Sequence, residues 1–257
     1  MNHTRRSLYF PFSLGHLAND LVPCSVVVLA PAIAIEMGLN PMEVGLLLTL
    51  HTLGSALGFF PAGLLADSSK NRGNLLMFTF WWVGLGYLLA SWAPGFWSLA
   101  LLFALAGCGD AAWHPLATAI LVQSDPQNRG QALGLHAVGG TLSAVIGPVI
   151  VGYLLSSMDW RETLHWIILP TLLFGLLFLK IRKWVPEQKH HKAISKEDFR
   201  HLWKCWTKKT GLLIICLMSI YHMSLVALMS MIPLYLREFH GMSSAMTGLA
   251  FGMMVLA

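Results

Sequence analysis

Residues 8–34 read LYFPFSLGHLANDLVPCSVVVLAPAIA, an apolar stretch interrupted by one histidine, one asparagine and one aspartate. It is longer than the roughly 20 apolar residues that a helix needs to cross the hydrocarbon core of a bilayer. The apolar centre of a cleavable signal peptide is unbroken, and here His16, Asn19 and Asp20 would interrupt it. We therefore expect this stretch to remain in the protein as a first membrane-spanning helix.

The rest of the chain continues this pattern. Hydrophobic residues make up 56% of the sequence and charged residues only 11%, with a mean hydropathy of +0.63, whereas soluble domains carry roughly 25% charged residues. Further apolar stretches long enough to span a membrane are 44–66, 75–92, 97–122, 131–156, 164–181 and 211–236, and another begins near Ala245. The sequence predicts an all-α membrane protein.

Positive charges indicate how these helices are oriented. If the N-terminus lies in the cytoplasm, only two of the 17 Lys and Arg residues, Arg161 and Arg237, fall on the outside. Such an excess of inner Lys and Arg is typical of inner-membrane proteins. The basic isoelectric point of about 9.1 then reflects topology, and we expect the bilayer, and no nucleic acid, as a partner.

A polar, basic segment divides the chain. We expect residues 1–181 to form a six-helix half, 182–210 a cytoplasmic linker, and 211–257 the first one and a half helices of a second half. Four residues before the linker recur after it with offsets of 202 or 203 positions: Pro31, Glu36, Gly38 and Gly45 as Pro233, Glu238, Gly241 and Gly248. Internal repeats of this kind mark secondary transporters.

The repeat has two consequences. A complete protein would have roughly 400 residues and twelve spans by this logic, so we expect a missing C-terminal half to be needed for function. The same offset makes His222 the counterpart of Asp20.

Two Asp/His pairs lie inside apolar stretches: His16 with Asp20, and Asp110 with His114. The i,i+4 spacing places both members of a pair on one helix face, and ionisable groups at membrane depth indicate function. At 1.5 Å per residue, both histidines lie about 12 Å and both aspartates about 18 Å from the cytoplasmic helix ends. We expect all four to meet near the bilayer centre, where they can exchange protons.

Two alternative interpretations remain open for these groups. They could form ordinary hydrogen bonds between helices, worth about 0.6 kcal/mol each in membranes, and we prefer that interpretation for the isolated histidines His51, His136 and His165. His and Asp side chains also suit divalent metal ions such as zinc or manganese.

Glycine and proline residues cluster in the fifth and fourth stretches. The fifth carries Gly130, Gly134, Gly139, Gly140, Gly147, Pro148 and Gly152, a smooth surface that permits close helix packing and a bend at the proline. In the fourth, His114-Pro115 places a second break beside the polar cluster. This pattern favours a moving transporter over a static bundle.

Three motifs in the first half resemble the major facilitator superfamily. The run Gly63-Leu64-Leu65-Ala66-Asp67 resembles its G-x-L-a-D loop, with a degenerate basic continuation through Lys70 and Arg72. Gly139-Gly140 followed by Gly147-Pro148 and Gly152 resembles the G-P motif of its antiporters, and Trp160-Arg161 resembles another recurrent dipeptide. The resemblance implies a two-halved helical bundle in which Gly63, Asp67 and Arg72 take part in gating.

A narrower resemblance is to the fosmidomycin-resistance branch of this superfamily. It rests on Gly15-His16-Leu17-Ala18-Asn19-Asp20, on Gly107-Cys108-Gly109 through His114-Pro115, and on residues 134–140. It implies proton-driven drug efflux from the bacterial inner membrane. The chain departs from the branch at Asp110, where a small polar residue is common, and at Leu116, where a Glu is common, so the substrate does not carry over.

Together these patterns predict a proton-coupled secondary transporter that exports a small organic compound by alternating access. His16, Asp20, Asp110 and His114 would bind the proton or polar groups of the substrate, Asn19 and Trp113 would line the cavity, and His222 would contribute from the second half. We expect no enzyme, cofactor or resident metal, because the chain has none of the His-x-x-x-His boxes of di-iron membrane enzymes. Alternatives are a divalent metal-ion transporter and a non-transporting receptor on the same scaffold.

Overall fold

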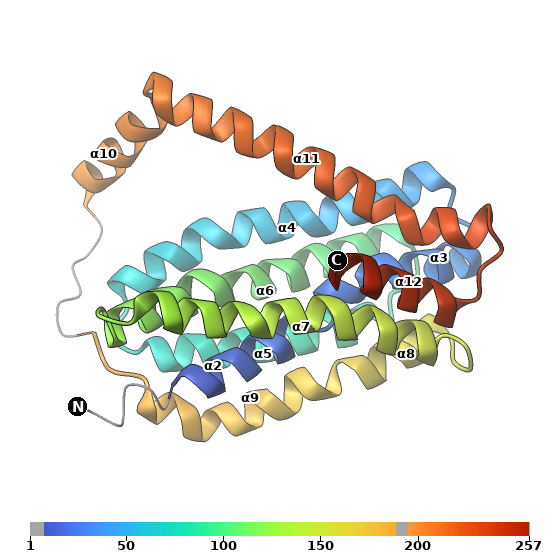
Figure 1. The fold of residues 1–257 in the computed structure, drawn as a ribbon, viewed down its shortest axis with the longest axis horizontal. Coiled ribbons are helices and arrows are strands. Elements are labelled where there is room, and N and C mark those ends of the chain that lie inside the picture. The colour runs from blue at the N-terminus through green and yellow to red at the C-terminus, as the bar shows by residue number, and fades with distance from the viewer. Residues whose placement is uncertain (1–7, 189–194, 257) are drawn as a thin grey trace.

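The computed structural model describes residues 8–188 and 195–256, and within these ranges the regular elements are all helices. Long helices lie side by side along the longest axis of the molecule (Figure 1). Their bounds are α2 Tyr9–Asp20, η1 Pro23–Ser25, α3 Val26–Met37, α4 Pro41–Ser68, α5 Arg72–Ala90, α6 Phe96–Ser124, α7 Arg129–Leu154, α8 Trp160–Ile167, α9 Leu169–Ile181, η2 Arg182–Trp184, α10 Lys196–Thr207, α11 Lys209–Glu238 and α12 Ser244–Leu256.

The predicted spans are confirmed as helices of membrane-crossing length and composition. Six helices qualify in the described part of the chain, with α8, α9 and η2 together forming one of them, and a seventh qualifies if α2 and the η1–α3 segment are one span. The expected partial eighth span is the 13-residue apolar helix α12. The predicted all-α membrane fold is therefore correct.

The first span is broken where the sequence predicted a continuous helix. α2 ends at Asp20, and the chain resumes at Pro23 with a bend of 42°. Pro23 cannot donate a backbone hydrogen bond to the preceding turn. Pro115, at which we expected a break, lies instead inside the uninterrupted helix α6, and Pro148, at which we expected a bend, lies inside α7.

The internal repeat has a counterpart in the backbone. Gly38 follows α3 with φ +64°, and Gly241 follows α11 with φ +61°. Among the described residues these two are the ones with positive φ, a conformation in which glycine avoids the steric penalty of a Cβ atom. Each therefore ends a helix and turns the chain into the next one, as the 203-residue offset predicts.

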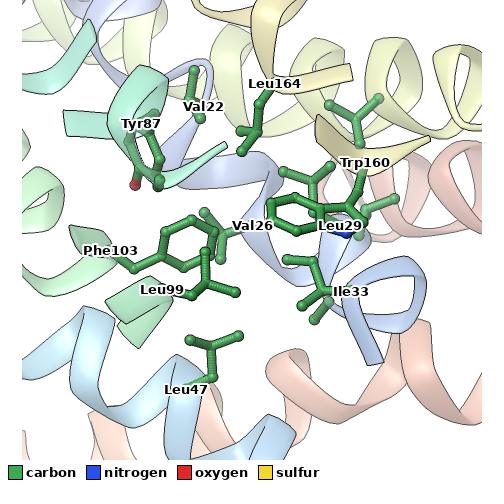
Figure 2. Packing of buried hydrophobic residues seen from close by; sticks show 14 of the residues in the cluster. Val22, Val26, Leu29, Ile33, Leu47, Tyr87, Leu99, Phe103, Trp160 and Leu164 are labelled. Carbon is green, nitrogen blue, oxygen red and sulfur yellow. The ribbon is translucent and has the colours of Figure 1, made fainter. Parts of the chain in front are cut away.

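One apolar core holds the broken first span against its neighbours. Val26, Leu29 and Ile33 of α3 point into a cluster with Phe103 of α6 and Trp160 of α8 (Figure 2). All five are buried. This cluster lies on the α3 side of the break and so supports the end of α2 where the polar residues are.

Two parts of the fold differ from the rest of the bundle. The linker predicted for 182–210 contains a helix, α10, that was not expected from the sequence. Helix α11 runs along one side of the bundle above α4 (Figure 1), with most of its side chains exposed. Its buried residues, Pro233 and Leu234, are at the end that packs on α3.

Candidate functional site

The polar residues of α2 and α6 meet inside the bundle. Nε2 of His16 lies 3.1 Å from Oδ2 of Asp20, and Nε2 of His114 lies 3.9 Å from Oδ1 of the same aspartate. The amide of Asn19 donates to Oδ1 of Asp110 at 2.6 Å and to Oδ1 of Asp20 at 3.1 Å. The predicted convergence of these side chains is therefore present in the structure.

The pairing inside this cluster differs from the expected one. His16 and Asp20 pair within α2 as the i,i+4 spacing suggests, but His114 reaches Asp20 across the helix interface. Asp110 instead accepts the amide of Asn19, which is fully buried and needs an acceptor there. Asp20 is consequently the residue on which the two histidines converge.

The hydrogen-bond pattern of His16 determines where its protons are. Nδ1 of His16 lies 2.8 Å from the backbone oxygen of His136. A carbonyl oxygen only accepts, so Nδ1 carries a hydrogen. The remaining nitrogen, Nε2, faces a carboxyl oxygen, and two lone pairs at 3.1 Å would repel each other. A second proton is therefore needed on either His16 or Asp20.

The two carboxyl groups of the cluster also favour the presence of an added proton. Asp20 and Asp110 are brought together by the amide of Asn19, from which both carboxyl groups accept a hydrogen bond, and both are nine-tenths buried. Carboxyl groups so close together in an apolar interior share a proton rather than both carrying a charge. Asp20 is also the last residue of α2, where the helix dipole disfavours a negative charge.

His136 of α7 belongs to this cluster, although the sequence indicated only an isolated histidine. Its ring stacks on that of His16 with centroids 4.1 Å apart and planes 20° apart, and its Nδ1 lies 3.3 Å from the backbone oxygen of Phe12. The expected interhelical hydrogen bond is thus present, and its Nε2 is buried without a hydrogen-bond partner. The sequence signal was its position three residues before Gly139-Gly140.

The other isolated histidines form the interhelical contacts expected of them. Nε2 of His51 lies 2.7 Å from the hydroxyl of Tyr87, and Nε2 of His165 lies 2.8 Å from Oγ of Ser91. These contacts join α4 to α5 and the end of α5 to α8.

Glycines of α7 allow this helix to pack closely against the cluster formed by α2 and α6. A Cβ atom on Gly140 would lie 2.5 Å from Cε1 of His16, and one on Gly139 would collide with the backbone of Ser13. Further along, Gly147 packs against Leu21 and Ser25 at the break of the first span. The close packing predicted for these glycines is confirmed.

The far end of α7 packs on the second repeat. Gly152 lies against Gly248 of α12, and the backbone oxygen of Pro148 also contacts Gly248. Gly130 and Gly134 have open space around their Cα atoms, so the expected smooth surface begins only at Gly139.

Two predicted site residues lie elsewhere. Trp113 does not line a cavity: it is fully buried, with its ring between those of Phe12 and Phe80 at centroid distances of 5.7 and 4.9 Å. His222 is exposed on α11, and its ring contact in the described part of the chain is with Tyr221. A contribution of His222 to the cluster therefore stays a prediction.

The predicted gating residues lie together where α4 ends and α5 begins. We call this the basic end of the bundle, because most of the Lys and Arg residues lie on this side of the spans. Gly63 and Asp67 are in the last turns of α4, which continues to Ser68, so the expected loop is shorter than predicted. The backbone oxygen of Asp67 accepts a hydrogen bond from Gln188 at 3.1 Å. Arg72 is 2% exposed and donates to Gln123 of α6 at 2.6 Å, which joins α5 to α6.

A divalent ion is chemically compatible with part of the cluster. Ligand atoms of His16, Asp20 and His114 all lie within 4.8 Å of one another, and imidazole with carboxylate is a donor set for zinc or manganese. His114 is the most exposed of the three, with 26% of its side chain accessible. Access to the cluster is therefore from the α6 side.

A family model for the Major Facilitator Superfamily matches residues 13–257. The chain belongs to the Major Facilitator Superfamily. The match extends from α2 across the 182–210 segment into α12, so it covers most of the chain.

Two curated relatives of this superfamily member show the extent of the similarity. The fosmidomycin resistance protein of Escherichia coli (strain K12) is 25% identical over 179 residues, covering 68% of this chain and 43% of that protein. A probable 4-methylmuconolactone transporter of Cupriavidus pinatubonensis is 29% identical over 157 residues, covering 59% and 36%. The resemblance to the fosmidomycin-resistance branch is confirmed, and the matched part of the chain covers less than half the length of each relative.

A solved structure confirms the Major Facilitator Superfamily fold. A bacterial homolog of the human lysosomal transporter Spinster, in an inward-facing and unoccupied conformation, superposes with a TM-score of 0.74 at 19% sequence identity. The match covers 98% of this chain and 59% of that one. The superfamily motifs recognised in the sequence thus lie at the end of α4, in α7 and at the start of α8.

Proposed function

We propose that the chain supplies the proton-binding half of a proton-coupled exporter of small organic compounds that works by alternating access. The observation that carries this proposal is the contact between His16 and Asp20, which needs a proton because Nδ1 of His16 is already a donor to a backbone carbonyl. A group that must be protonated in one arrangement and can lose the proton in another is what coupling requires.

The structure suggests how release of the proton is linked to movement. Asp20 is at the break of the first span, and α7 packs on both sides of that break through Gly140 and Gly147. A shift of α7 against α2 would change the distance between His16 and Asp20, and with it the stability of the shared proton. The backbone oxygen that binds His16 belongs to α7 as well.

Export of an organic compound is supported by the relatives. The Escherichia coli protein is named for resistance to fosmidomycin, and the Cupriavidus protein for 4-methylmuconolactone transport. The described spans of the first half hold no lysine or arginine near the cluster, so this half binds a substrate through hydrogen bonds and aromatic surface, not through a permanent cation.

The proposed orientation places the N-terminus and the 182–210 linker in the cytoplasm of a bacterium, with the spans in its inner membrane. It rests on the distribution of Lys and Arg, of which Arg161 and Arg237 are at the opposite end of the bundle. Accessibility of single cysteines introduced at Ser195 and Ser157 to an impermeant reagent in intact cells tests it. Labelling of Ser195→Cys without labelling of Ser157→Cys would reverse the orientation.

The proton itself is tested by infrared spectroscopy at neutral pH, which detects the C=O stretch of a protonated carboxyl group. We expect a protonated carboxyl band that Asp20→Asn and Asp110→Asn each change. Asp159→Asn, which alters a helix-capping carboxylate away from the cluster, should leave the band unchanged. No protonated carboxyl band in the wild-type chain would refute the shared proton.

Coupling is tested in vesicles containing the protein that carries this chain. Asp20→Asn and Asp110→Asn should each abolish flux driven by a pH gradient while leaving membrane insertion intact. Normal gradient-driven flux in both variants would end the proton-relay interpretation.

A second candidate, transport of a divalent metal ion, is favoured by the spacing of His16, Asp20 and His114. Isothermal titration with Zn²⁺ and Mn²⁺ separates the two. Metal binding that is lost in His114→Gln but kept in Asp110→Asn would favour metal transport, because Asp110 is outside the three-residue group.

A further inference from the structure

A polar cavity lies at the basic end of the bundle, away from the buried cluster. It has a volume of about 360 Å³ and is lined by Asn71, Asn74, Arg182, Lys183, Val185 and Glu187. These residues come from the start of α5 and from the segment that follows α9. Both helices are membrane-spanning and both reach the end of their spans here, so the cavity lies at the depth of lipid headgroups.

The cavity is electropositive. Arg182 and Lys183 bring two cations to its wall, and the N-terminus of the 19-residue helix α5 adds the positive end of a helix dipole. The one acidic group of the wall, Glu187, lies 3.4 Å from Nζ of Lys70, which offsets its charge. A phosphate group fits such a site because it accepts hydrogen bonds from guanidinium, ammonium and amide donors.

The site is held in shape by contacts behind the cavity wall. Arg182 donates to the side chain of Asn74, and its backbone oxygen lies where a Cβ atom on Gly73 would be, so α5 and η2 touch directly. Arg72 is buried behind the wall and donates to the backbone oxygen of Pro186. Lys183 forms no hydrogen bond or ion pair with the described residues, which leaves its ammonium group available to a ligand.

An apolar surface formed by α5 and α9 continues from the cavity towards the bilayer centre. Helices α5 and α9 run antiparallel, since Gly73 meets Arg182 and Trp81 meets Gly175. On their outer surface, Leu176 and Leu179 are exposed, with 50% and 41% of each residue accessible, and Trp81 is half-buried beside them. An aliphatic chain would cover this apolar surface, while a free phosphate ion would leave it uncovered.

We propose that the cavity between α5 and η2 binds the phosphate group of an anionic phospholipid, whose acyl chain lies on the apolar surface along Trp81, Leu176 and Leu179. The lipid bridges the third and sixth spans at the basic end of the bundle. Trp184, with 51% of its surface exposed beside the cavity, is the kind of aromatic residue found at the headgroup level of membrane proteins. The proposal does not depend on proton coupling.

Native mass spectrometry of the detergent-purified chain tests this site with two lipids, dioleoyl phosphatidylglycerol and dioleoyl phosphatidylcholine. We expect phosphatidylglycerol to bind more tightly, because its net charge is not cancelled by a choline group. The double variant Arg182→Gln/Lys183→Gln should bind phosphatidylglycerol roughly 30-fold more weakly, since each cation near a membrane surface contributes about 1 kcal/mol, or a factor of about five, to anionic lipid binding.

Matched controls separate the cavity from general charge. The pair Lys204→Gln/Lys208→Gln removes the same charge from the linker and should bind phosphatidylglycerol like the wild type. If Arg182→Gln prevents folding, Lys183→Gln alone should still weaken binding about fivefold, because Lys183 supports no other contact in the described structure. Equal loss in the linker control, or no loss in Lys183→Gln, would overturn the site.

A final measurement distinguishes a lipid from a free anion. Inorganic phosphate at millimolar concentration should neither remain bound to the chain nor displace phosphatidylglycerol, because it makes no contact with the apolar surface. Retention of inorganic phosphate with no preference for the lipid would show an anion site and refute the proposed phospholipid.

Discussion

The imidazole of His16 lies flat against that of His136, 4.1 Å away, while its Nδ1 donates to the backbone oxygen of the same residue. Helix α7 therefore controls His16 in two ways, through a ring that supports its face and through a carbonyl that fixes its tautomer. Only the first depends on the side chain at position 136. This division can be tested by substitution.

His136→Phe should preserve the orientation of His16, because phenylalanine keeps the stacked ring and the backbone carbonyl remains. His136→Ala removes the ring, and we expect a loss of at least about 0.5–1.5 kcal/mol in unfolding free energy from the aromatic pair alone. Thermal unfolding in detergent measures the loss, and the protonated carboxyl band reports the state of Asp20. A His136→Phe variant as impaired as His136→Ala would show that the second imidazole itself exchanges protons.

Gly140 sets how closely α7 approaches the cluster. A Cβ atom there would lie 2.5 Å from Cε1 and 2.7 Å from Nε2 of His16, so Gly140→Val must push the imidazole or the helix away. We expect a loss of about 1–3 kcal/mol in unfolding free energy and a changed carboxyl band. Gly134→Val, on the same helix but with open space around it, is the control and should cost little. Equal losses of unfolding free energy in the two variants would mean that the loss in Gly140→Val comes from helix propensity and not from contact with His16.

Asn19 links the two aspartates by donating to both. A double-mutant cycle with Asn19→Ala and Asp110→Ala should give a coupling free energy of about 0.6–1.7 kcal/mol, the range found for hydrogen bonds in membrane bundles. Combining Asn19→Ala with Arg237→Gln at the far end of α11 should give additive effects. Additivity in the first cycle as well would contradict the hydrogen bond to Asp110.

Variants of Trp113 distinguish a structural role for this residue from a role in substrate binding. Because its ring is fully buried among Phe12, Phe80 and Phe178, Trp113→Ala should lower unfolding free energy by about 3–5 kcal/mol. Trp113→Phe, which keeps an aromatic ring in the cluster, should cost much less. A stable Trp113→Ala variant with weakened substrate binding would instead restore the cavity-lining role that the sequence suggested.

Much of the fold follows from local sequence properties. The spans could be located because a membrane helix satisfies its own backbone and must be apolar over a fixed length. The contact between His16 and Asp20 followed from helix periodicity, since residues four apart share a face. Both predictions depend on one helix at a time and need no knowledge of its neighbours.

The predictions that were wrong concern side chains whose contacts are determined by neighbouring helices. Trp113 was expected beside His114 in a cavity, but consecutive helical residues point about 100° apart, and the direction of Trp113 is towards aromatic side chains of other helices. Asp110 was expected to pair with His114, yet its carboxyl group accepts a hydrogen bond from the buried amide of Asn19 instead.

Proline shows the same limit. Most prolines of the described spans lie inside continuous helices: the uninterrupted cases are Pro31, Pro61, Pro115, Pro148 and Pro233. The helix is interrupted beside Pro23, with a bend of 42°, and beside Pro170, where α8 ends and α9 begins within one span. Membrane helices tolerate proline where neighbouring groups satisfy the freed carbonyls. Composition alone therefore could not single out Pro23.

The paired glycines that end α3 and α11 offer a test of the internal repeat itself. Gly38 and Gly241 have φ values of +64° and +61°, and an alanine in this region costs about 1–2 kcal/mol. Gly38→Ala and Gly241→Ala should each lower unfolding free energy by about that amount, although neither site has an atom near enough to clash with a Cβ. The asparagine variants should cost less, because asparagine adopts the left-handed conformation more readily.

Gly63→Ala is the control for this test. Gly63 also has open space around it but lies inside α4, where alanine is favoured over glycine by about 0.5–1 kcal/mol, so Gly63→Ala should raise the unfolding free energy. Thermal unfolding in detergent compares all three sites, and a stabilising Gly241→Ala would show that the turn after α11 is not equivalent to the turn after α3.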